Sequence, residues 1–302
     1  MQPLIGIVIV NWNGENFLKD CLDSVRTQTY ESLKCVIVDN NSTDASVDLI
    51  KNYYSDVSLI LNNENLGVAE GNNQGINYWL NRGAKYIVLL NNDTKLDPNL
   101  ISNLFETMGD DSSIAAGCPK IYYFDEPEII FSAGGTFSKF KARGFERGQN
   151  EKDIGVYNEI CDVTYSSTCC LMVRAEIFRA VGFMDTDYYM YADDTDFIYR
   201  LHKKNYRVIF VPKAIMWHRV QASTGGRHKQ SLFSLYYGAR NTLLFAKKHD
   251  LDTPFFLIYF YSIKFLRFFL WIFKGELKRA MVLARAIVDY YRGIYGRSFE
   301  KI

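Results

Sequence analysis

The sequence predicts an α/β fold in which a mostly parallel central sheet is flanked by helices and followed by a C-terminal helical extension. Two observations support this prediction. Apolar runs alternate with helical patterns four times within about the first 95 residues, and the connections between them are short. The 302 residues are also 48% hydrophobic, which is ample for a large core. Such alternation produces parallel strands joined by right-handed crossovers.

Four strands are expected, each from an apolar run rich in β-branched residues, which is typical of strands buried on both faces. They lie at residues 4–10, 34–38, 57–61 and 85–90. Helical patterns lie between them at residues 15–28, from residue 42 to 50, and 69–81. Ser42 or Thr43 is expected to cap the second of these helices.

Polar residues follow the strands at the points where they end. They are Asn11 and Asn13, Asp39, Asn65 and Gly67, and Asn92 and Asp93. Ligands of parallel sheets bind beyond these carboxyl ends. Asn, Asp and Gly are also ordinary turn formers. Turn formation alone could explain the presence of any one of these residues. It explains less well why two strands end in an acid and why an acidic cluster follows later in the chain.

The later cluster places Asp193, Asp194 and Asp196 among aromatic residues. Burying three carboxylates together is costly, so at least one should have a raised pKa or a cationic partner. Alternatively, Asp194 or Thr195 caps a helix. Before this cluster, short runs and glycines over residues 113–170 predict hairpins and an irregular, lid-like stretch.

Several classes of site are not supported. The sequence has no GxGxxG after the first strand and no GxxxxGK[ST], so no phosphate-binding glycine loop is expected. An acid after a hydrophobic strand suggests instead that a metal holds phosphates. His218, after the strand-like run at 208–211, is either a metal ligand or a structural histidine. The net charge of +1 gives no reason to expect a nucleic-acid partner.

The cellular compartment is predicted from the cysteines and the N-terminus. The six cysteines show no CxxC spacing, and Met1 leads within a few residues into the first strand without a signal peptide. We therefore expect a reducing, cytoplasmic protein.

The segment 254–273 is mostly aromatic and aliphatic, and it approaches the roughly 20 residues needed to span a bilayer. A basic stripe is expected on one side of this helix, from Lys264, Arg267, Trp271, Lys274 and Lys278. Such a helix suits a membrane interface, so peripheral contact through residues 254–280 is predicted. Packing against the protein and a true span are the alternatives, and mid-bilayer charge disfavours the span.

Together these motifs resemble a family 2 glycosyltransferase of the GT-A fold, of the rhamnosyltransferase-like kind. The resemblance covers roughly residues 4–245, and it rests on the order and spacing of the motifs. The matching pieces are Ile9-Val10-Asn11-Trp12-Asn13, Val36-Ile37-Val38-Asp39-Asn40-Asn41-Ser42-Thr43-Asp44, Asn65-Leu66-Gly67, Gly71-Asn72-Asn73-Gln74-Gly75, Leu89-Leu90-Asn91-Asn92-Asp93, Gly182-Phe183-Met184-Asp185, Asp193-Asp194-Thr195-Asp196 and Ala239-Arg240-Asn241.

The resemblance implies a role for each position. Asp39 would bind the base of a nucleotide-sugar donor, with Asn11, Asn13, Gly67, Asn72 and Asn92 also on the donor side. Asn91-Asn92-Asp93 stands where the family has DxD, which leaves Asp93 as the main carboxylate ligand of Mg²⁺ or Mn²⁺, with His218 as a second ligand. Asp194 matches the catalytic base, and Asp193, Asp185 and Cys169 fall on the acceptor side.

The resemblance also implies the activity and the domain layout. It implies an inverting transferase that moves a sugar from a donor such as dTDP-rhamnose or a UDP-hexose to a glycan or polyprenyl-linked saccharide, in polysaccharide synthesis at the inner face of the cell membrane. Residues 1–225 would form the catalytic domain, with a nucleotide-binding half at 1–110 and an acceptor half at 111–225, and residues 226–302 the helical region. A non-catalytic glycan-binding protein and a nucleotidyltransferase are the alternatives.

Overall fold

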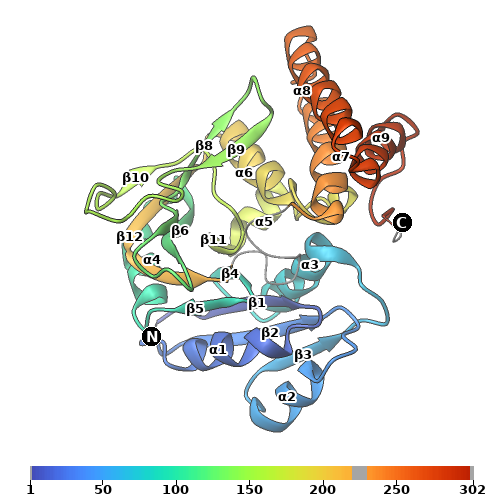
Figure 1. The fold of residues 1–302 in the computed structure, drawn as a ribbon. Helices are drawn as coiled ribbons and strands as arrows, with labels where there is room; N and C mark the ends of the chain where they lie inside the picture. The colour runs from blue at the N-terminus through green and yellow to red at the C-terminus, as the bar shows by residue number, and fades with distance from the viewer. Residues whose placement is uncertain (1, 220–229, 300–302) are drawn as a thin grey trace.

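The N-terminal part of the chain folds as four strands alternating with three helices, as the apolar runs predict (Figure 1). The computed structural model describes residues 2–219 and 230–299. The elements are β1 (Ile5–Asn11), α1 (Glu15–Arg26), β2 (Leu33–Asp39), α2 (Ser46–Tyr53), β3 (Ser58–Leu61), α3 (Gly67–Leu80) and β4 (Tyr86–Asn91).

These four strands are parallel neighbours in the order β4-β1-β2-β3. Their register aligns Asn11 with Asp39, and Val10 with Asn91. The polar residues that follow the strands therefore lie at one edge of the sheet, where ligands of such sheets bind. Helices cover the sheet, so β1 is buried on both faces: Ile7 and Ile9 belong to one core cluster, and Val8 belongs to the other.

The second half of the chain extends this sheet into a mixed, ten-stranded one. β11 (Cys170–Arg174) lies antiparallel between β4 and β6 (Ile114–Tyr123), and β12 (Arg207–His218) runs parallel to β6. The marginal strands are β5 (Thr94–Leu96), β7 (Ile130–Ser132) and β10 (Cys161–Asp162). A mostly parallel sheet flanked by helices is thus confirmed in outline, with antiparallel strands confined to this second half.

Residues 113–170 match their prediction only in part. The hairpin of β8 (Gly135–Ser138) and β9 (Arg143–Glu146) is present, but β6 is a buried strand of the main sheet and not part of a lid. The small residues of β6 weaken the apolar pattern by which a strand is recognised in the sequence. They serve packing, since a Cβ added at Gly117 would lie 3.2 Å from Met108 Sδ on helix α4 (Leu100–Met108).

The predicted cap of the second helix is wrong. α2 follows Ala45 and has no side-chain cap. Ser42 instead accepts the N–H of Asn13 (2.9 Å) and donates its hydroxyl to Asp39 (2.6 Å), because the loop before the helix folds back onto the end of β1.

Helix α3 packs on β1 through glycines, which lets the two backbones approach closely. A Cβ added at Gly75 would lie 2.2 Å from Val8 Cγ1, and one at Gly71 would lie 2.8 Å from Val10 Cγ1. One turn further on, Trp79 fills the space above Gly6 and donates its indole N–H to the Ile7 carbonyl at 2.9 Å.

The remaining helices follow β11. They are α5 (Ala175–Val181), the 3₁₀ turn η1 (Thr186–Tyr188), α6 (Asp193–Lys203), α7 (Leu232–Lys248), α8 (Pro254–Phe273) and α9 (Leu277–Tyr291). The domain boundary predicted at residues 225–226 lies outside the described residues. By length and composition α8 is able to cross a membrane, and 11% of its most apolar window is buried. The predicted basic stripe is interrupted, because α8 ends at Phe273 and Lys278 belongs to α9.

The glycine contact between α3 and β1 predicts opposite outcomes for one substitution at two helical sites. Gly75→Ala should destabilise the protein by about 1–3 kcal/mol, because overpacking at Val8 exceeds the gain in helix propensity. Gly238→Ala in α7, where an added Cβ meets nothing within 4 Å, should stabilise it by about 0.5–1 kcal/mol. Urea unfolding of both variants checks this, and equal shifts in one direction would contradict it.

Candidate active site

A buried chain of amide and carboxylate groups joins the ends of three parallel strands. Asn92 Nδ2 donates to Asn11 Oδ1 at 2.7 Å, and Asn11 Nδ2 donates to Asp39 Oδ2 at 2.8 Å. Gly14 leaves room for this chain, since a Cβ there would lie 2.3 Å from both Asn11 Oδ1 and Asn92 Nδ2. The three predicted donor-side residues therefore lie together.

Asp39 also organises the loop that follows β2. Its carboxylate accepts the backbone N–H of Ser42 at 2.8 Å as well as the Ser42 hydroxyl, and the residue is 1% exposed. Asn13, in a left-handed conformation with φ 51°, accepts the N–H of Thr43 at 2.8 Å. Both residues thus have structural partners at the site, and the contribution of Ser42 was not predicted.

The N-terminus of α3 lies against the segment that leads into the acidic cluster. Gly67 has φ +85°, and a Cβ there would lie 2.5 Å from the Tyr189 carbonyl oxygen. The next residue, Val68, donates its N–H to the same carbonyl at 2.9 Å. Asn72, a further predicted donor-side residue, is buried on this helix.

Asp93 and His218 meet at the edge of the sheet. Antiparallel pairing of β5 with β12 aligns Thr94 with His218, which brings Asp93 Oδ1 within 3.0 Å of His218 Nε2. Both side chains are buried, yet among the described residues neither Asp93 Oδ1 nor His218 Nδ1 has a hydrogen-bond partner. Leaving such groups unsatisfied costs about 1–3 kcal/mol each.

This pair fits a divalent cation. A carboxylate oxygen suits Mg²⁺ and Mn²⁺, and imidazole is also accepted by Mn²⁺. Within residues 2–219 and 230–299 no group of three His, Cys, Asp or Glu side chains is placed to hold a metal. A cation here would therefore take its remaining ligands from water or from a bound substrate.

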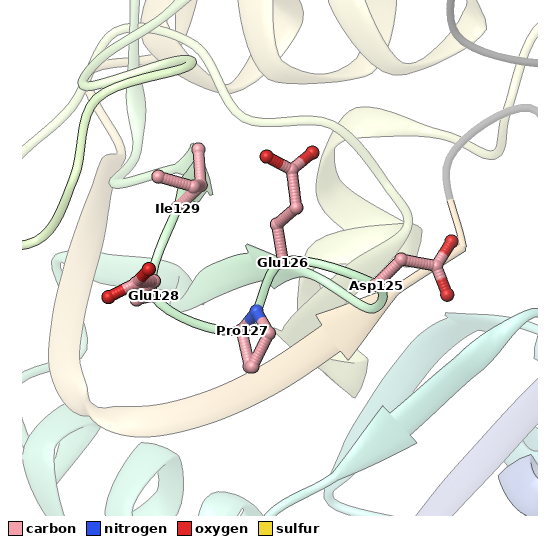
Figure 2. A pocket seen from close by; sticks show the side chains of 5 residues that line it. All are labelled: Asp125, Glu126, Pro127, Glu128 and Ile129. Atoms are coloured by element: carbon pink, nitrogen blue, oxygen red, sulfur yellow. The ribbon is translucent and has the colours of Figure 1, made fainter.

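An open hollow of about 460 Å³ lies beside the chain that follows β6 (Figure 2). It is lined by Asp125, Glu126, Pro127, Glu128 and Ile129, which follow the end of β6. The preceding residue, Phe124, donates its N–H to the His218 carbonyl at 3.0 Å. The hollow therefore borders the end of β12 that carries His218.

The three acids of the predicted cluster have different surroundings. Asp196 is buried and accepts from Arg200 Nε (2.6 Å) and His249 Nε2 (2.7 Å), so it joins α6 to α7. Asp193 is buried, and its Oδ2 has no partner in the described part of the chain. Asp194 is partly exposed and accepts the Thr195 N–H at 2.6 Å. Burial raises the pKa of both Asp193 and Asp194, and the charge of Asp194 adds to the effect on Asp193.

Two residues of α7 hold the segment in front of these acids. Asn241 Nδ2 donates to the carbonyls of Tyr188, Met190 and Tyr191 at 2.8–2.9 Å. Arg240, also fully buried, donates to the carbonyls of residues 187, 188 and 296. The sequence motif Ala239-Arg240-Asn241 was recognised only as a resemblance, and this is its structural role.

Three further residues interact either with Asp194 or with Asp93 of the Asp93–His218 pair. The Tyr165 hydroxyl donates to Asp194 Oδ2 at 3.3 Å, and the Tyr165 ring packs on Gly144 and Gly135 of the β8–β9 hairpin. Burial, and then the charge of Asp194, raises the pKa of Glu146 to about 8. Burial, and then the charges of Glu146 and Asp93, raises the pKa of the Cys169 thiol.

Cys169 therefore lies within electrostatic reach of Asp93 and of Glu146. Tyr165 and Glu146 were not predicted as site residues, because no local pattern marks a tyrosine or glutamate that reaches the site from a hairpin region. Asp185, predicted on the acceptor side, accepts from the ammonium group of Lys248 and from the Asp187 N–H. Its carboxylate is therefore engaged with α7.

Curated relatives of this chain are glycosyltransferases. It is 23% identical to glycosyltransferase GlyA of Streptococcus pneumoniae serotype 4 over 74% of its own length, and it spans only 31% of that protein. It is 25% identical to the uncharacterized glycosyltransferase MJ1057 of Methanocaldococcus jannaschii over 87% of each chain.

Solved glycosyltransferase structures share the fold. GalNAc-T7 with UDP, GalNAc and Mn²⁺ superposes with a TM-score of 0.64 at 15% identity, covering 86% of this chain and 50% of that one. The mannosyltransferase PcManGT from Pyrobaculum calidifontis, with GDP-Man and Mn²⁺, gives a TM-score of 0.59 at 15% identity, covering 97% and 76%. Both have the GT-A fold.

The family model described as "Glycosyl transferase family 2" matches residues 6–182, which include nearly all of the four N-terminal parallel strands, the strand-end network and Asp93. On this match, the chain belongs to glycosyltransferase family 2.

Proposed function

We propose that this protein transfers a sugar from a nucleoside-diphosphate-sugar to a hydroxyl of a glycan or lipid-linked saccharide, with inversion at the anomeric carbon. One observation supports this above others. The segment from Tyr165 to Cys169 reaches towards both acids: the Tyr165 hydroxyl donates to Asp194 Oδ2 at 3.3 Å, and the Cys169 carbonyl accepts the N–H of Asn91, two residues before Asp93, at 3.0 Å. Asp93 and Asp194 thus border one region of the molecule, as a displacement between two carboxylates requires.

The strand-end network would form the donor side. Asn11, Asn13, Asp39, Gly67, Asn72 and Asn92 line the carboxyl edge of the parallel sheet or the start of α3. The related folds of GalNAc-T7 and PcManGT were solved with UDP and GDP-Man respectively, which supports a nucleotide donor. dTDP-rhamnose and a UDP-hexose are the donors that we propose to test.

Asp93 and His218 would hold a divalent cation. Asp93 Oδ1 lies 3.0 Å from His218 Nε2 and has no hydrogen-bond partner among the described residues, and a bound Mn²⁺ or Mg²⁺ would satisfy this oxygen. When bound, the cation supplies positive charge where the departing diphosphate gains negative charge. The imidazole favours Mn²⁺ over Mg²⁺.

Asp194 would be the general base. Compared with Asp193, it is more exposed, and it accepts hydrogen bonds from Thr195 and Tyr165 that stabilise its charged form. It would take the proton of the acceptor hydroxyl while that oxygen bonds to the anomeric carbon. The bond from that carbon to the diphosphate oxygen breaks, and the electron pair leaves with the nucleoside diphosphate. Asp193, Asp185 and Cys169 would border the acceptor.

The helix α8 supports a lipid-linked acceptor. Its apolar length and low burial suit contact with a membrane surface through residues 254–280, at the cytoplasmic face of the cell membrane. Synthesis of a cell-surface polysaccharide or glycoconjugate is the process that such a placement serves.

Asp194→Asn should lower turnover by about 10²–10⁴-fold and leave donor affinity near that of the wild type, because only proton removal is lost. Single-turnover kinetics with a candidate nucleotide sugar, together with a donor titration, measure the two effects. Asp48→Asn, an exposed acid-to-amide change on α2, is the control. Wild-type turnover in Asp194→Asn would remove this residue from the mechanism.

Tyr165→Phe should move the acid limb of the pH–rate profile to higher pH. The Tyr165 hydroxyl bond lowers the pKa of Asp194 against the larger effect of burial. Without that bond the pKa rises further, so the charged base is lost at a higher pH as the solution is acidified. A profile of kcat/KM against pH tests this, and an unshifted acid limb would show that the bond does not act on the base.

Asp93→Asn should weaken Mn²⁺-dependent binding of UDP or GDP by at least about tenfold. Mutation of residues that only hydrogen-bond to a metal ligand already lowers metal affinity by about that factor. Isothermal titration of the nucleotide, with Mn²⁺ and with a chelator, measures the metal-dependent part. His218→Gln should act in the same direction. If both variants keep the wild-type response to Mn²⁺, the pair does not bind the cation.

A further inference from the structure

The outward side of α8 is mostly apolar, with the exposed Ser262 as a polar residue between its two apolar parts. Its exposed apolar residues lie in the first turn and over residues 265–273. They are Phe255, Ile258, Phe265, Leu266, Phe269, Leu270, Ile272 and Phe273. Phe255 is 77% exposed and Phe273 is 94% exposed. An exposed apolar face of this kind on a protein surface marks a place where another apolar phase or molecule docks.

The basic residues of α8 lie on a different side from this face. Lys264 follows Phe256 and Phe260 at spacings of four, and those two phenylalanines are buried. The Lys264 amine lies 5.1 Å from the centre of the Phe260 ring. The helix therefore carries its charge along the margin that faces the protein body.

The tip of the β8–β9 hairpin, residues 139–143, packs along that same margin. Ala142 is buried in the core cluster that contains Phe256 and Phe260. Phe140 contacts Tyr259 of α8 with ring centres 5.1 Å apart, yet it remains 52% exposed. Figure 1 shows the hairpin tip beside α8 at one end of the molecule. Phe140 thus extends the apolar face beyond the helix.

Positive charge gathers around this tip. Lys139 and Arg143 are exposed and Lys141 is partly exposed. Lys264 lies within electrostatic reach of Arg267 and of Arg143. In residues 2–219 and 230–299, none of these five cations has an ion pair with a carboxylate. Cations beside an apolar face complement anionic headgroups above acyl chains.

We propose that the hairpin tip is a second bilayer contact, and that with the outer face of α8 it binds the protein to an anionic lipid surface. The proposal goes beyond a membrane helix, because it assigns recognition of lipid charge to an element of the catalytic domain. It rests on the proposed function in one respect, which is that the acceptor is linked to a lipid.

The hairpin also connects this surface with the site. Arg143 begins β9 at the lipid end, and Glu146, which lies within electrostatic reach of Asp194, ends the same strand. The base of the hairpin supports the ring of Tyr165, the hydrogen-bond donor to Asp194. An acceptor held in the bilayer would therefore meet the base within the length of one short strand.

The test is sedimentation of the full chain with vesicles of phosphatidylglycerol and phosphatidylcholine in equal parts, and with vesicles of phosphatidylcholine alone. Binding should be stronger to the anionic vesicles. The double variant Lys139→Glu/Lys141→Glu should weaken that binding by about tenfold or more. Phe140→Ser should weaken binding to both vesicle types.

The control is Lys34→Glu/Lys51→Glu, which reverses two exposed charges on β2 and α2, away from the hairpin (Figure 1). Wild-type binding by the hairpin variant, or an equal loss in the control, would overturn the proposal. So would a homodimer in vesicle-free sedimentation that Phe140→Ser abolishes, since the face would then bind a second copy. Thermal unfolding excludes a folding defect. Hairpin-dependent vesicle binding by a protein that turns over no nucleotide sugar would uphold this surface and overturn only the proposed function.

Discussion

The backbone carbonyls of residues 187, 188, 190 and 191 accept hydrogen bonds from Arg240 and Asn241, and the arrangement of the acidic cluster depends on this contact. Tyr189, Tyr191 and Ala192 all have positive φ, a conformation that costs roughly 1–3 kcal/mol per residue unless the surroundings compensate. The buried amide and guanidinium supply that compensation. Since α6 begins at the next residue, Asp193, the direction of Asp194 is set by a helix that comes almost fifty residues later in the chain. Helix α7 is therefore joined by buried hydrogen bonds to the segment that leads into the acidic cluster.

A second feature is found at the strand ends, on the other side of the site. In the described part of the chain, the buried polar side chains there hydrogen-bond to one another, except for Asp93 and His218. Hydrogen bonds join the side chains of Asn92, Asn11, Asp39 and Ser42 to one another. Asp93 Oδ1 and His218 Nδ1 have no such partner within residues 2–219 and 230–299, although their side chains are equally buried. In a protein interior such an exception normally indicates a missing partner.

Much of this was predictable from the sequence, and the failures have physical causes. The four parallel strands and their polar ends follow from apolar runs of β-branched residues, which have few other stable arrangements. β6 escaped prediction because Ala115, Ala116 and Gly117 were selected for close contact with α4 and not for strand propensity. Tyr165 and Glu146 escaped because their relation to Asp194 exists only through long-range packing of a hairpin. The side of α8 that carries charge could be read from spacing, but which side faces outward depends on α7 and the hairpin, which the helix pattern does not contain.

The last described residues contact Arg240, the side chain that holds the carbonyls of residues 187 and 188. Arg240 donates to the carbonyl of Gly296 and to the Ser298 hydroxyl, and Tyr236 bonds Asp289 and Ser298. Trimming the gene after α7 to obtain a more soluble protein would remove hydrogen-bond acceptors from a buried guanidinium and loosen the segment that leads into the acidic cluster. Polar replacements confined to the outer side chains of α8, which support nothing inside the molecule, are the better route to material for crystallisation.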